Sequence, residues 1–179
     1  MKIRQKGFTL VELLVTIGIV AVLASLAAPS FRTLLVRRNV QSAADALVTD
    51  MRFARSEALK RSTRTVICRS TNGSSCSGNG SWNVGWMVFV DMNSNGSLDG
   101  SEEVIRVQQL LSNISTIQST NVVSDLSAFN YEPTGWAKGA TQSFILTPSG
   151  SVPAGTTRLV CISSTGRPAI RVEGTSSCV

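Results

Sequence analysis

Near its N-terminus the chain reads Gly7-Phe8-Thr9-Leu10-Val11-Glu12, behind three basic residues and at the start of an apolar run that ends at Ala28. The 21 residues from Phe8 to Ala28 would measure about 31 Å as a helix, enough to cross the hydrocarbon core of a bilayer. Glu12 lies inside this run, where an unpaired charge costs at least about 2.5 to 3.5 kcal/mol. The carboxylate therefore predicts a cationic partner.

The basic start, the Gly7-Phe8 junction and Glu12 resemble the class III signal of type IV pilins and of the pseudopilins of type II secretion. The resemblance implies that a prepilin peptidase cleaves after Gly7, removes residues 1–7 as a leader and methylates the new N-terminus at Phe8. It also implies that Glu12 pairs with the terminal amine of a neighbouring subunit during filament assembly. Because Glu12 follows Phe8 by four residues, this pairing would offset neighbouring subunits by about one helical turn.

Two other interpretations of the apolar run stay open. An ordinary secretory signal would be cleaved near Ala24-Ser25-Leu26-Ala27-Ala28, but it explains neither Glu12 nor Gly7-Phe8. A plain single-span anchor explains the length of the run and nothing else. The pilin-type signal is favoured because it accounts for the glycine and the carboxylate together.

The net charge falls when the leader is removed. The whole chain has 17 basic and 11 acidic side chains, and loss of Lys2, Arg4 and Lys6 leaves 14 against 11, a net charge of +3. These three residues are interpreted as holding the N-terminus on the cytoplasmic side of the inner membrane. The chain is then a single-pass protein with a periplasmic C-terminal domain, which becomes part of a pilus or pseudopilus after assembly.

The four cysteines follow the membrane segment, and an even number in a periplasmic domain favours disulfides. They are Cys68, Cys76, Cys161 and Cys178. Four cysteines allow three pairings, and proximity in sequence favours Cys68 with Cys76 and Cys161 with Cys178. The chain has no histidine and no CxxC pair, which excludes histidine-based zinc sites and Ser-His or Cys-His catalysis.

Beyond Pro29 a helical pattern continues as one apolar stripe, formed by Val40, Ala44, Leu47, Met51, Ala54 and Ala58. The charged residues between them, Asp50 and Glu57 included, are expected to face solvent. The pattern predicts one helix from about Phe8 to Arg61, with residues 8–28 in the membrane and residues 29–61 amphipathic. Pro29 removes a backbone hydrogen bond and predicts a kink or local melting.

After Ser62 the chain changes to short β-branched and aromatic runs separated by Gly, Asn, Ser and Pro, which is typical of an antiparallel sheet. Strands are expected at 64–69, 82–90, 103–109, 113–118, 143–147, 157–163 and 167–172. Residues 62–179 then form a periplasmic β domain, and the fold class is α+β. The loop at 70–81 is almost wholly Ser, Gly and Asn, and it needs the Cys68–Cys76 disulfide to stay ordered.

Three later segments resemble the GspH/FimT group of minor pilins and pseudopilins: 54–58, 82–91 and the dipeptide Gly166-Arg167. The resemblance covers nearly the whole chain. It implies the type IV pilin fold, in which a long N-terminal helix packs on an antiparallel sheet. The implied partners are other pilins, the prepilin peptidase and the inner membrane.

The segment 91–102 fits the calcium-loop pattern D-x-[DN]-x-[DN]-G-x5-E. Its predicted ligands are Asp91, Asn93, Asn95, Asp99 and Glu102. A hard cation takes six to eight oxygens, and the central Gly96 permits the sharp bend. The flanking segments are expected to be strands rather than helices, so a hairpin turn rich in Asn, Asp and Gly is the alternative. Calcium is the single cofactor that the sequence predicts, and the predicted function does not require a cofactor.

Basic residues are segregated along the chain. Segment 32–69 has a net charge of +6 and segment 138–179 of +3, whereas segment 70–137 has a net charge of −5. Such patches bind phosphates. The candidate DNA-binding residues are Lys138, Arg158, Arg167 and Arg171.

FimT-type minor pilins are associated with DNA uptake in natural transformation, and a C-terminal Gly-Arg-x-Arg motif is implicated in holding the DNA. Here Ala169 replaces the second arginine of that motif. If 167–172 is a strand, Arg167 and Arg171 point to one face, so Arg171 could serve instead. Double-stranded DNA is the ligand that the resemblance implies, and a structural role for the same arginines is the alternative.

Most aromatic residues are expected in the core, because Trp82 and Trp86 would share one strand face with Val84 and Val88. Trp136, in a turn-like segment, is the exposed exception. Taken together, the sequence predicts a minor pilin that primes pilus assembly and binds DNA, and not an enzyme. The alternatives are an H-type pseudopilin of type II secretion and a membrane-anchored periplasmic hydrolase, for which the chain offers no nucleophile–base pair.

Overall fold

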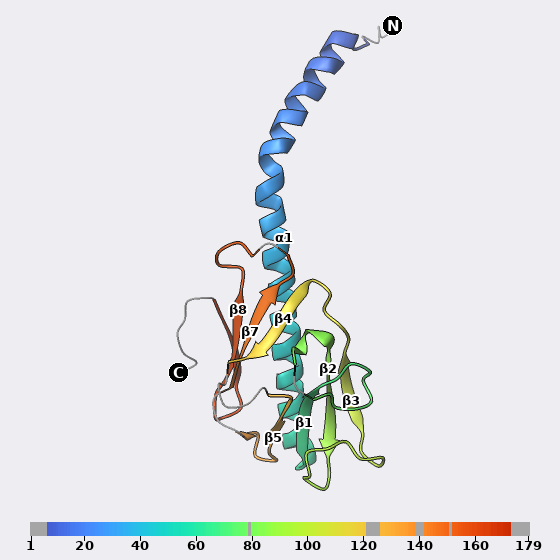
Figure 1. Cartoon of the computed structure of the whole chain (residues 1–179), viewed down its shortest axis with the longest axis vertical. Coiled ribbons are helices and arrows are strands. Elements are labelled where there is room, and N and C mark those ends of the chain that lie inside the picture. The colour runs from blue at the N-terminus through green and yellow to red at the C-terminus, as the bar shows by residue number, and fades with distance from the viewer. Residues whose placement is uncertain (1–6, 79, 121–125, 139–141, 151, 173–179) are drawn as a thin grey trace, which may run out of the picture. The chain divides into compact units, whose positions relative to one another are not determined.

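The structure is a computed structural model that describes residues 7–78, 80–120, 126–138, 142–150 and 152–172. One long helix, α1 (Leu10–Arg61), is followed by strands of two sheets. The chain divides into two units, one ending at Leu35 and one beginning at Val36. Figure 1 shows that the strands of the second unit lie along that unit's part of α1.

The C-terminal part of α1 buries the predicted apolar stripe. All six predicted stripe residues are buried, and Ala43 and Val48 widen the stripe. They pack on residues from both sheets in one core cluster that includes Trp82, Trp86 and Phe144. The expectation that Asp50 and Glu57 face solvent is wrong, since both are buried.

The first sheet has the strand order β3-β2-β1-β5-β6. Its strands are β1 (Arg64–Arg69), β2 (Trp86–Asp91), β3 (Val104–Gln108), β5 (Ala128–Tyr131) and β6 (Ala137–Lys138). All neighbours pair antiparallel. β2 is buried along its whole length because Trp86 and Val88 belong to the main core, whereas Met87 and Phe89 join a second cluster on the other face.

The second sheet has the strand order β4-β7-β8-β9, again antiparallel. Its strands are β4 (Ile114–Ser119), β7 (Gln142–Pro148), β8 (Arg158–Ile162) and β9 (Pro168–Val172). The short 3-10 helix η1 (Trp82–Val84) joins it to the first sheet. The Ser81 hydroxyl accepts a hydrogen bond from Ile117 N (2.8 Å), and the Asn83 amide donates to Ile114 O (3.0 Å).

The predicted strand 82–90 is wrong in its first residues, which form η1. The chain turns at Gly85, which has a φ of 119°. A Cβ at this position would lie 2.5 Å from Gln108 O and 3.1 Å from Ser70 O, so only glycine allows the backbones to approach so closely. Strands β5 and β6 were not predicted, and the other predicted strands agree with the structure within one or two residues.

The predicted Cys68–Cys76 disulfide is confirmed, with a Cα–Cα distance of 5.6 Å. It closes the start of the loop that follows β1. Cys161 is also disulfide-bonded, and its predicted partner Cys178 lies outside the described residues.

The sequence predicted a kink or local melting at Pro29; helix α1 runs through Pro29 without interruption, so the helix is not melted there. Proline lacks the N–H that would bond the carbonyl one turn earlier. Ser30 and Thr33 donate their hydroxyl groups to the carbonyls of Ala27 (2.8 Å) and Pro29 (3.2 Å). These two side-chain hydrogen bonds connect residues within α1 on either side of the proline.

Candidate functional site

The first unit is an apolar helix without a covering layer. Within the described residues, α1 is the one helix long and apolar enough to cross a membrane, with a window of mean hydropathy 2.5 that has no buried residue. Leu10 is 74% exposed and Phe8, just before the helix, is 88% exposed. Such a surface requires lipid or other apolar helices around it.

Glu12 does not stand alone at the start of this helix. One of its oxygens, Oε2, accepts hydrogen bonds from the backbone N–H (3.1 Å) and the hydroxyl (3.2 Å) of Thr9. In return Thr9 Oγ1 accepts a hydrogen bond from Glu12 N at 3.2 Å. This reciprocal arrangement is a capping box, in which the N-cap residue and the third helical residue satisfy each other's free N–H groups.

Thr9 is thus a site residue that sequence reasoning missed. The string Thr9-Leu10-Val11-Glu12 fits the capping-box pattern T-x-x-E, which would have identified it. The capping box also changes the expected position of the Glu12 carboxylate, because its hydrogen bonds hold the carboxylate close to Thr9. Glu12 Oε2 is therefore placed beside the residue that follows Phe8.

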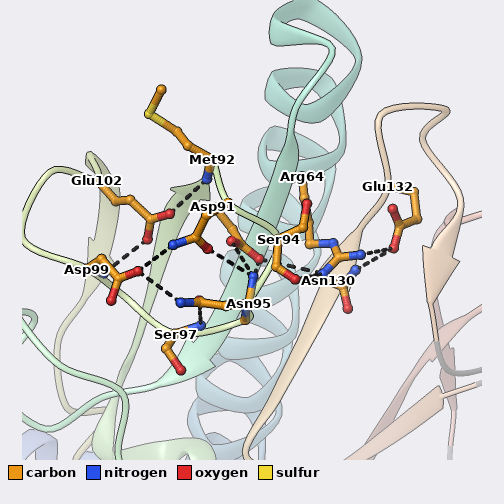
Figure 2. Close-up of polar contacts among 12 residues, drawn as sticks. Arg64, Asp91, Met92, Ser94, Asn95, Ser97, Asp99, Glu102, Asn130 and Glu132 are labelled. Carbon is orange, nitrogen blue, oxygen red and sulfur yellow. Dashed lines mark hydrogen bonds and ion pairs between the residues drawn. The ribbon is translucent and has the colours of Figure 1, made fainter.

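The second candidate site is the loop between β2 and β3, and Figure 2 shows its polar contacts. Asp91, at the end of β2, is fully buried. Its two oxygens accept hydrogen bonds from Asn95 N (3.1 Å) and Gly96 N (3.0 Å). Ser94 and Gly96 take the left-handed conformation with φ values of 63° and 79°, which lets the loop close on Asp91.

The remaining predicted calcium ligands bond to one another in the same loop (Figure 2). The side-chain amides of Asn93 and Asn95 donate to Asp99 Oδ2 at 2.6 and 2.9 Å. Glu102 accepts hydrogen bonds from Met92 N (2.8 Å) and Asp99 N (3.0 Å). Across the described part of the chain, no three His, Cys, Asp or Glu side chains are placed to hold a metal ion.

The donor set of this loop nevertheless suits calcium. It contains only oxygen ligands from three carboxylates and two amides, the kind that a hard cation prefers. Ligation would require the amides of Asn93 and Asn95 to turn their oxygens inward, away from their present donation to Asp99. The loop therefore fits calcium in residue type and backbone path, and its side chains would have to rearrange.

Arg64 connects this loop to the turn after β5. No such role was predicted for it from the sequence. Its Nη1 donates to Ser94 O (2.6 Å) and lies 3.8 Å from Asp91 Oδ2, and its Nη2 donates to Glu132 Oε1 (3.1 Å). Glu132 also accepts a hydrogen bond from the Asn130 amide at 2.9 Å. Arg64 is thus a structural link between the loop and the turn after β5.

The structure separates the four predicted DNA-binding residues. Arg158 is held inside the chain: its Nε donates to Gln41 Oε1 (3.0 Å) and its Nη1 to Thr157 O (2.9 Å). In the β8–β9 register Arg158 faces Val172 and Leu159 faces Arg171. Since strand residues alternate between faces, Arg158 and Arg171 point to opposite sides of the second sheet.

Arg167 and Lys138 are brought toward each other by the packing of two turns. Gly166 lies against the turn before β6, where a Cβ would meet Gly135 O at 2.3 Å and Ala137 N at 3.3 Å. Arg167 follows Gly166 directly, and Lys138 follows Ala137. Both side chains are exposed.

Trp136 lies in the same turn and is 56% exposed, as predicted. Trp82 and Trp86 are buried, also as predicted. Arg55 of α1 donates from Nε to Gly135 O at 2.9 Å, which fixes the turn to the helix. The exposed indole therefore lies in a turn that is fixed to α1.

Exposed positive charge in the described part of the chain is largely unpaired, whereas the acidic groups there are all engaged. Each described carboxylate has a hydrogen bond or an ion pair. Among the described residues, the basic side chains that have neither are those of Arg32, Arg37, Arg38, Arg52, Lys138, Arg167 and Arg171.

Known proteins resemble this chain along most of its length. A family model described as type II transport protein GspH matches residues 43–172, and a prokaryotic N-terminal methylation motif matches residues 2–28. The pilin-like protein PilA1 of Thermus thermophilus is 31% identical over 166 residues, which cover 91% of this chain and 96% of PilA1.

Two solved structures share the fold. The type IV minor pilin FimU of Pseudomonas aeruginosa has a TM-score of 0.57 at 20% identity and covers 80% of this chain and 97% of its own. The minor pseudopilin EpsH from the type 2 secretion system of Vibrio cholerae has a TM-score of 0.51 at 8% identity and covers 78% of this chain and 99% of its own. At these identities the likeness concerns the fold alone.

Proposed function

Because the chain belongs to the GspH family of minor type IV pilins and pseudopilins, we propose that it is a minor pilin that is built into a filament through its N-terminal helix. The predicted family and the type IV pilin fold are confirmed. The observation that carries the proposal is the uncovered apolar helix that begins with a carboxylate. In a precursor this helix spans the inner membrane, with the β domain in the periplasm, and in a filament it packs on other pilins.

Assembly in this proposal begins with leader removal. The methylation motif marks the chain as a substrate, and a prepilin peptidase would cleave after Gly7 and methylate Phe8. The new amine would then meet the Glu12 carboxylate of a neighbouring subunit. The capping box uses Oε2 of Glu12, and Oε1 is the oxygen available for that cation.

The Glu12 pairing is tested by incorporation into filaments. A Glu12→Gln chain keeps an acceptor for the capping box but loses its charge. We expect this chain to reach the membrane in normal amount and to be depleted from sheared filaments, as measured by immunoblot. Incorporation equal to that of the unchanged chain would contradict the role of the charge.

A pilus rather than a secretion pseudopilus is proposed because the relative with 31% identity is described as a pilin-like protein. One deletion strain, assayed for twitching, transformation and export, separates the two systems. Loss of twitching or transformation with normal export supports the pilus. Exoproteins retained in the periplasm with normal twitching would assign the chain to secretion instead.

We further propose that Lys138, Arg167 and Arg171 hold double-stranded DNA. Support comes from their exposure and their lack of partners among the described residues. Arg158 is left out because its guanidinium is engaged within the chain. Binding through phosphates should weaken steeply as salt rises.

Gel-shift titrations over a series of salt concentrations test this proposal with the detergent-solubilised mature chain. The variant Arg167→Ala plus Arg171→Ala should bind more weakly, and its salt dependence should lose a slope of about 1 for each phosphate contact removed. Arg52→Ala is the matched control, because Arg52 is exposed on α1 and no DNA contact is assigned to it. Equal binding by all three proteins would exclude the two arginines.

The β2–β3 loop is proposed as a calcium site, and its backbone path around Asp91 supports this. When bound, calcium would supply charge compensation for the three carboxylates of the loop. At a calcium concentration of 100 times Kd the native state would gain about 2.7 kcal/mol. Thermal unfolding should therefore shift upward with calcium in the unchanged chain and in Asp45→Asn, but not in Asp99→Asn. No shift at millimolar calcium would exclude the site.

A further inference from the structure

The junction between the leader and the helix has a defined structural boundary. Gly7, Phe8 and Thr9 are not helical, and α1 begins at Leu10. The first helical hydrogen bond runs from Leu13 N to Thr9 O at 3.2 Å, which makes Thr9 the N-cap. The peptide bond between Gly7 and Phe8 therefore lies two residues outside the helix.

Three hydrogen bonds between Thr9 and Glu12 hold this boundary. The Thr9 hydroxyl accepts from Glu12 N and donates to Glu12 Oε2, and Thr9 N donates to the same oxygen. The N–H groups of the first helical turn have no partner inside the helix, and a side-chain cap is one way to satisfy them. The cap supplies the partner that a further helical turn toward the leader would otherwise supply.

Without the cap the surroundings would favour a longer helix. The residues that follow are apolar and exposed, so this end of the helix belongs beside lipid, where water cannot satisfy free backbone groups. Extending the helix over Phe8 and Gly7 is then the remaining way to pair the N–H groups. In a helix extended over Phe8 and Gly7, the Gly7 carbonyl would accept a hydrogen bond from Val11 N, and a peptidase could not pair with that carbonyl.

From this geometry we propose that Thr9 is a positioning residue for leader removal. Its cap ends the helix at Leu10 and keeps the Gly7–Phe8 bond outside the helix, where the peptidase can pair with it. The reaction adds water across that bond, leaving a carboxylate on Gly7 and an amine on Phe8. This inference rests on the proposed processing after Gly7. It assigns the Thr9 cap to leader cleavage and the charge of Glu12 to the later step of filament assembly.

Variants of the full-length precursor separate the two steps. Thr9→Val keeps the shape of the side chain and removes the hydroxyl. Thr9→Ser restores the cap, because serine is as good an N-cap as threonine. Thr16→Val is the matched control, since the Thr16 hydroxyl donates to Leu13 O within the helix (2.8 Å) and caps nothing. Glu12→Gln keeps the box without the charge.

The test is a time course of cleavage in membranes that contain the full precursor and the prepilin peptidase, followed by mass spectrometry. Thr9→Val should be cleaved about fivefold more slowly, the factor expected for an average N-cap. Thr9→Ser, Thr16→Val and Glu12→Gln should be cleaved at the unchanged rate. Equal rates for Thr9→Val and the unchanged chain would overturn the inference.

Hydrogen exchange adds a readout that does not depend on the peptidase. In detergent micelles the Thr9→Val precursor should gain amide protection at Val11, because its N–H would bond the Gly7 carbonyl as the helix extends. Unchanged exchange at Val11 would also overturn the inference. If the unchanged precursor is not cleaved after Gly7 at all, the proposed function fails, and this inference fails with it.

Discussion

At the scale of single residues, Asp50 joins the helix to the first sheet. It is 3% exposed. Oδ2 accepts a hydrogen bond from Trp86 Nε1 (2.9 Å), and Oδ1 forms an ion pair with Arg106 Nε (2.9 Å). The Arg106 guanidinium also lies 5.6 Å from the centre of the Phe53 ring, which holds it over the helix. Both partners of Asp50 come from strands more than 30 residues away in sequence.

Asp50→Ala should therefore destabilise the domain. The change leaves the buried Trp86 N–H without an acceptor and removes a charged hydrogen bond, which together cost about 2 to 4 kcal/mol. Urea unfolding, followed by the fluorescence of the buried tryptophans, measures the loss. Asp45→Ala is the control, because Asp45 is exposed and bonds only to Gln41. Equal stability of the two variants would contradict this role for Asp50.

The burial of Asp50 could not be predicted from the sequence. Helical periodicity predicted the buried stripe because that stripe depends on local spacing. It placed Asp50 and Glu57 in solvent because a charged residue is rarely buried without a partner. Their partners Trp86, Arg106 and Arg61 were in the sequence, but pairing Asp50 required the register of β2 and β3 against α1. That register is a tertiary property.

At the scale of elements, the end of α1 is stabilised by charge. Glu57 Oε2 accepts a hydrogen bond from Arg61 Nε at 2.7 Å, and Arg61 Nη1 pairs with Glu103 Oε2 at 2.6 Å. The Arg61 guanidinium, bonded to Glu57, holds the pKa of that carboxyl below its ordinary value of 4.5. Glu57 thus ionises more readily in the folded chain than in the unfolded one.

A pH dependence of stability follows from this shift. A carboxyl with a lowered pKa in the folded state adds stability above its unfolded pKa and loses it as the pH falls through the folded pKa. Stability should therefore fall below about pH 4.5, and the fall should be shallower in Glu57→Gln. Thermal unfolding between pH 3 and 7 measures this. Identical pH profiles would show that Glu57 contributes nothing.

The loop after β1 depends on its disulfide. Cys68 is buried in β1 and Cys76 is exposed in a loop of short polar residues. Changing both cysteines to serine should lower the free energy of unfolding by about 2 to 3 kcal/mol, the value expected for a short closed loop. Proteolysis of the loop at 70–81 should become faster in the same variant. An unchanged digestion rate would contradict the proposed ordering by the disulfide.

The strands differ in how far sequence could predict them. β1, β2 and β3 have β-branched or aromatic residues at alternate positions, and turn residues mark their ends. β5 and β6 were missed because they are short and their pairing partners lie elsewhere. β5 pairs with β1 through contacts such as Ile67 with Phe129, and β6 has only two residues. Local composition does not encode such pairings.

At the scale of the whole molecule, the two units present different surfaces. Residues up to Leu35 present an apolar surface and the Thr9–Glu12 box, and residues from Val36 form a packed domain with free cations. The sequence predicted the exposed apolar helix of the first unit, because the residues of the apolar run are adjacent in the chain. It predicted the second unit less fully, since the packing of Gly166 against Gly135 and Ala137 is a tertiary contact.

The central claim is that the chain is a processed, pilin-type subunit rather than a protein with a plain anchor or an ordinary secretory signal. Intact-mass and N-terminal sequencing of the protein, isolated from membranes or filaments of its own organism, tests it most directly. The account predicts a mature chain that begins with N-methylated Phe8. A chain that keeps Met1 to Gly7, or one that begins near Pro29, would contradict it.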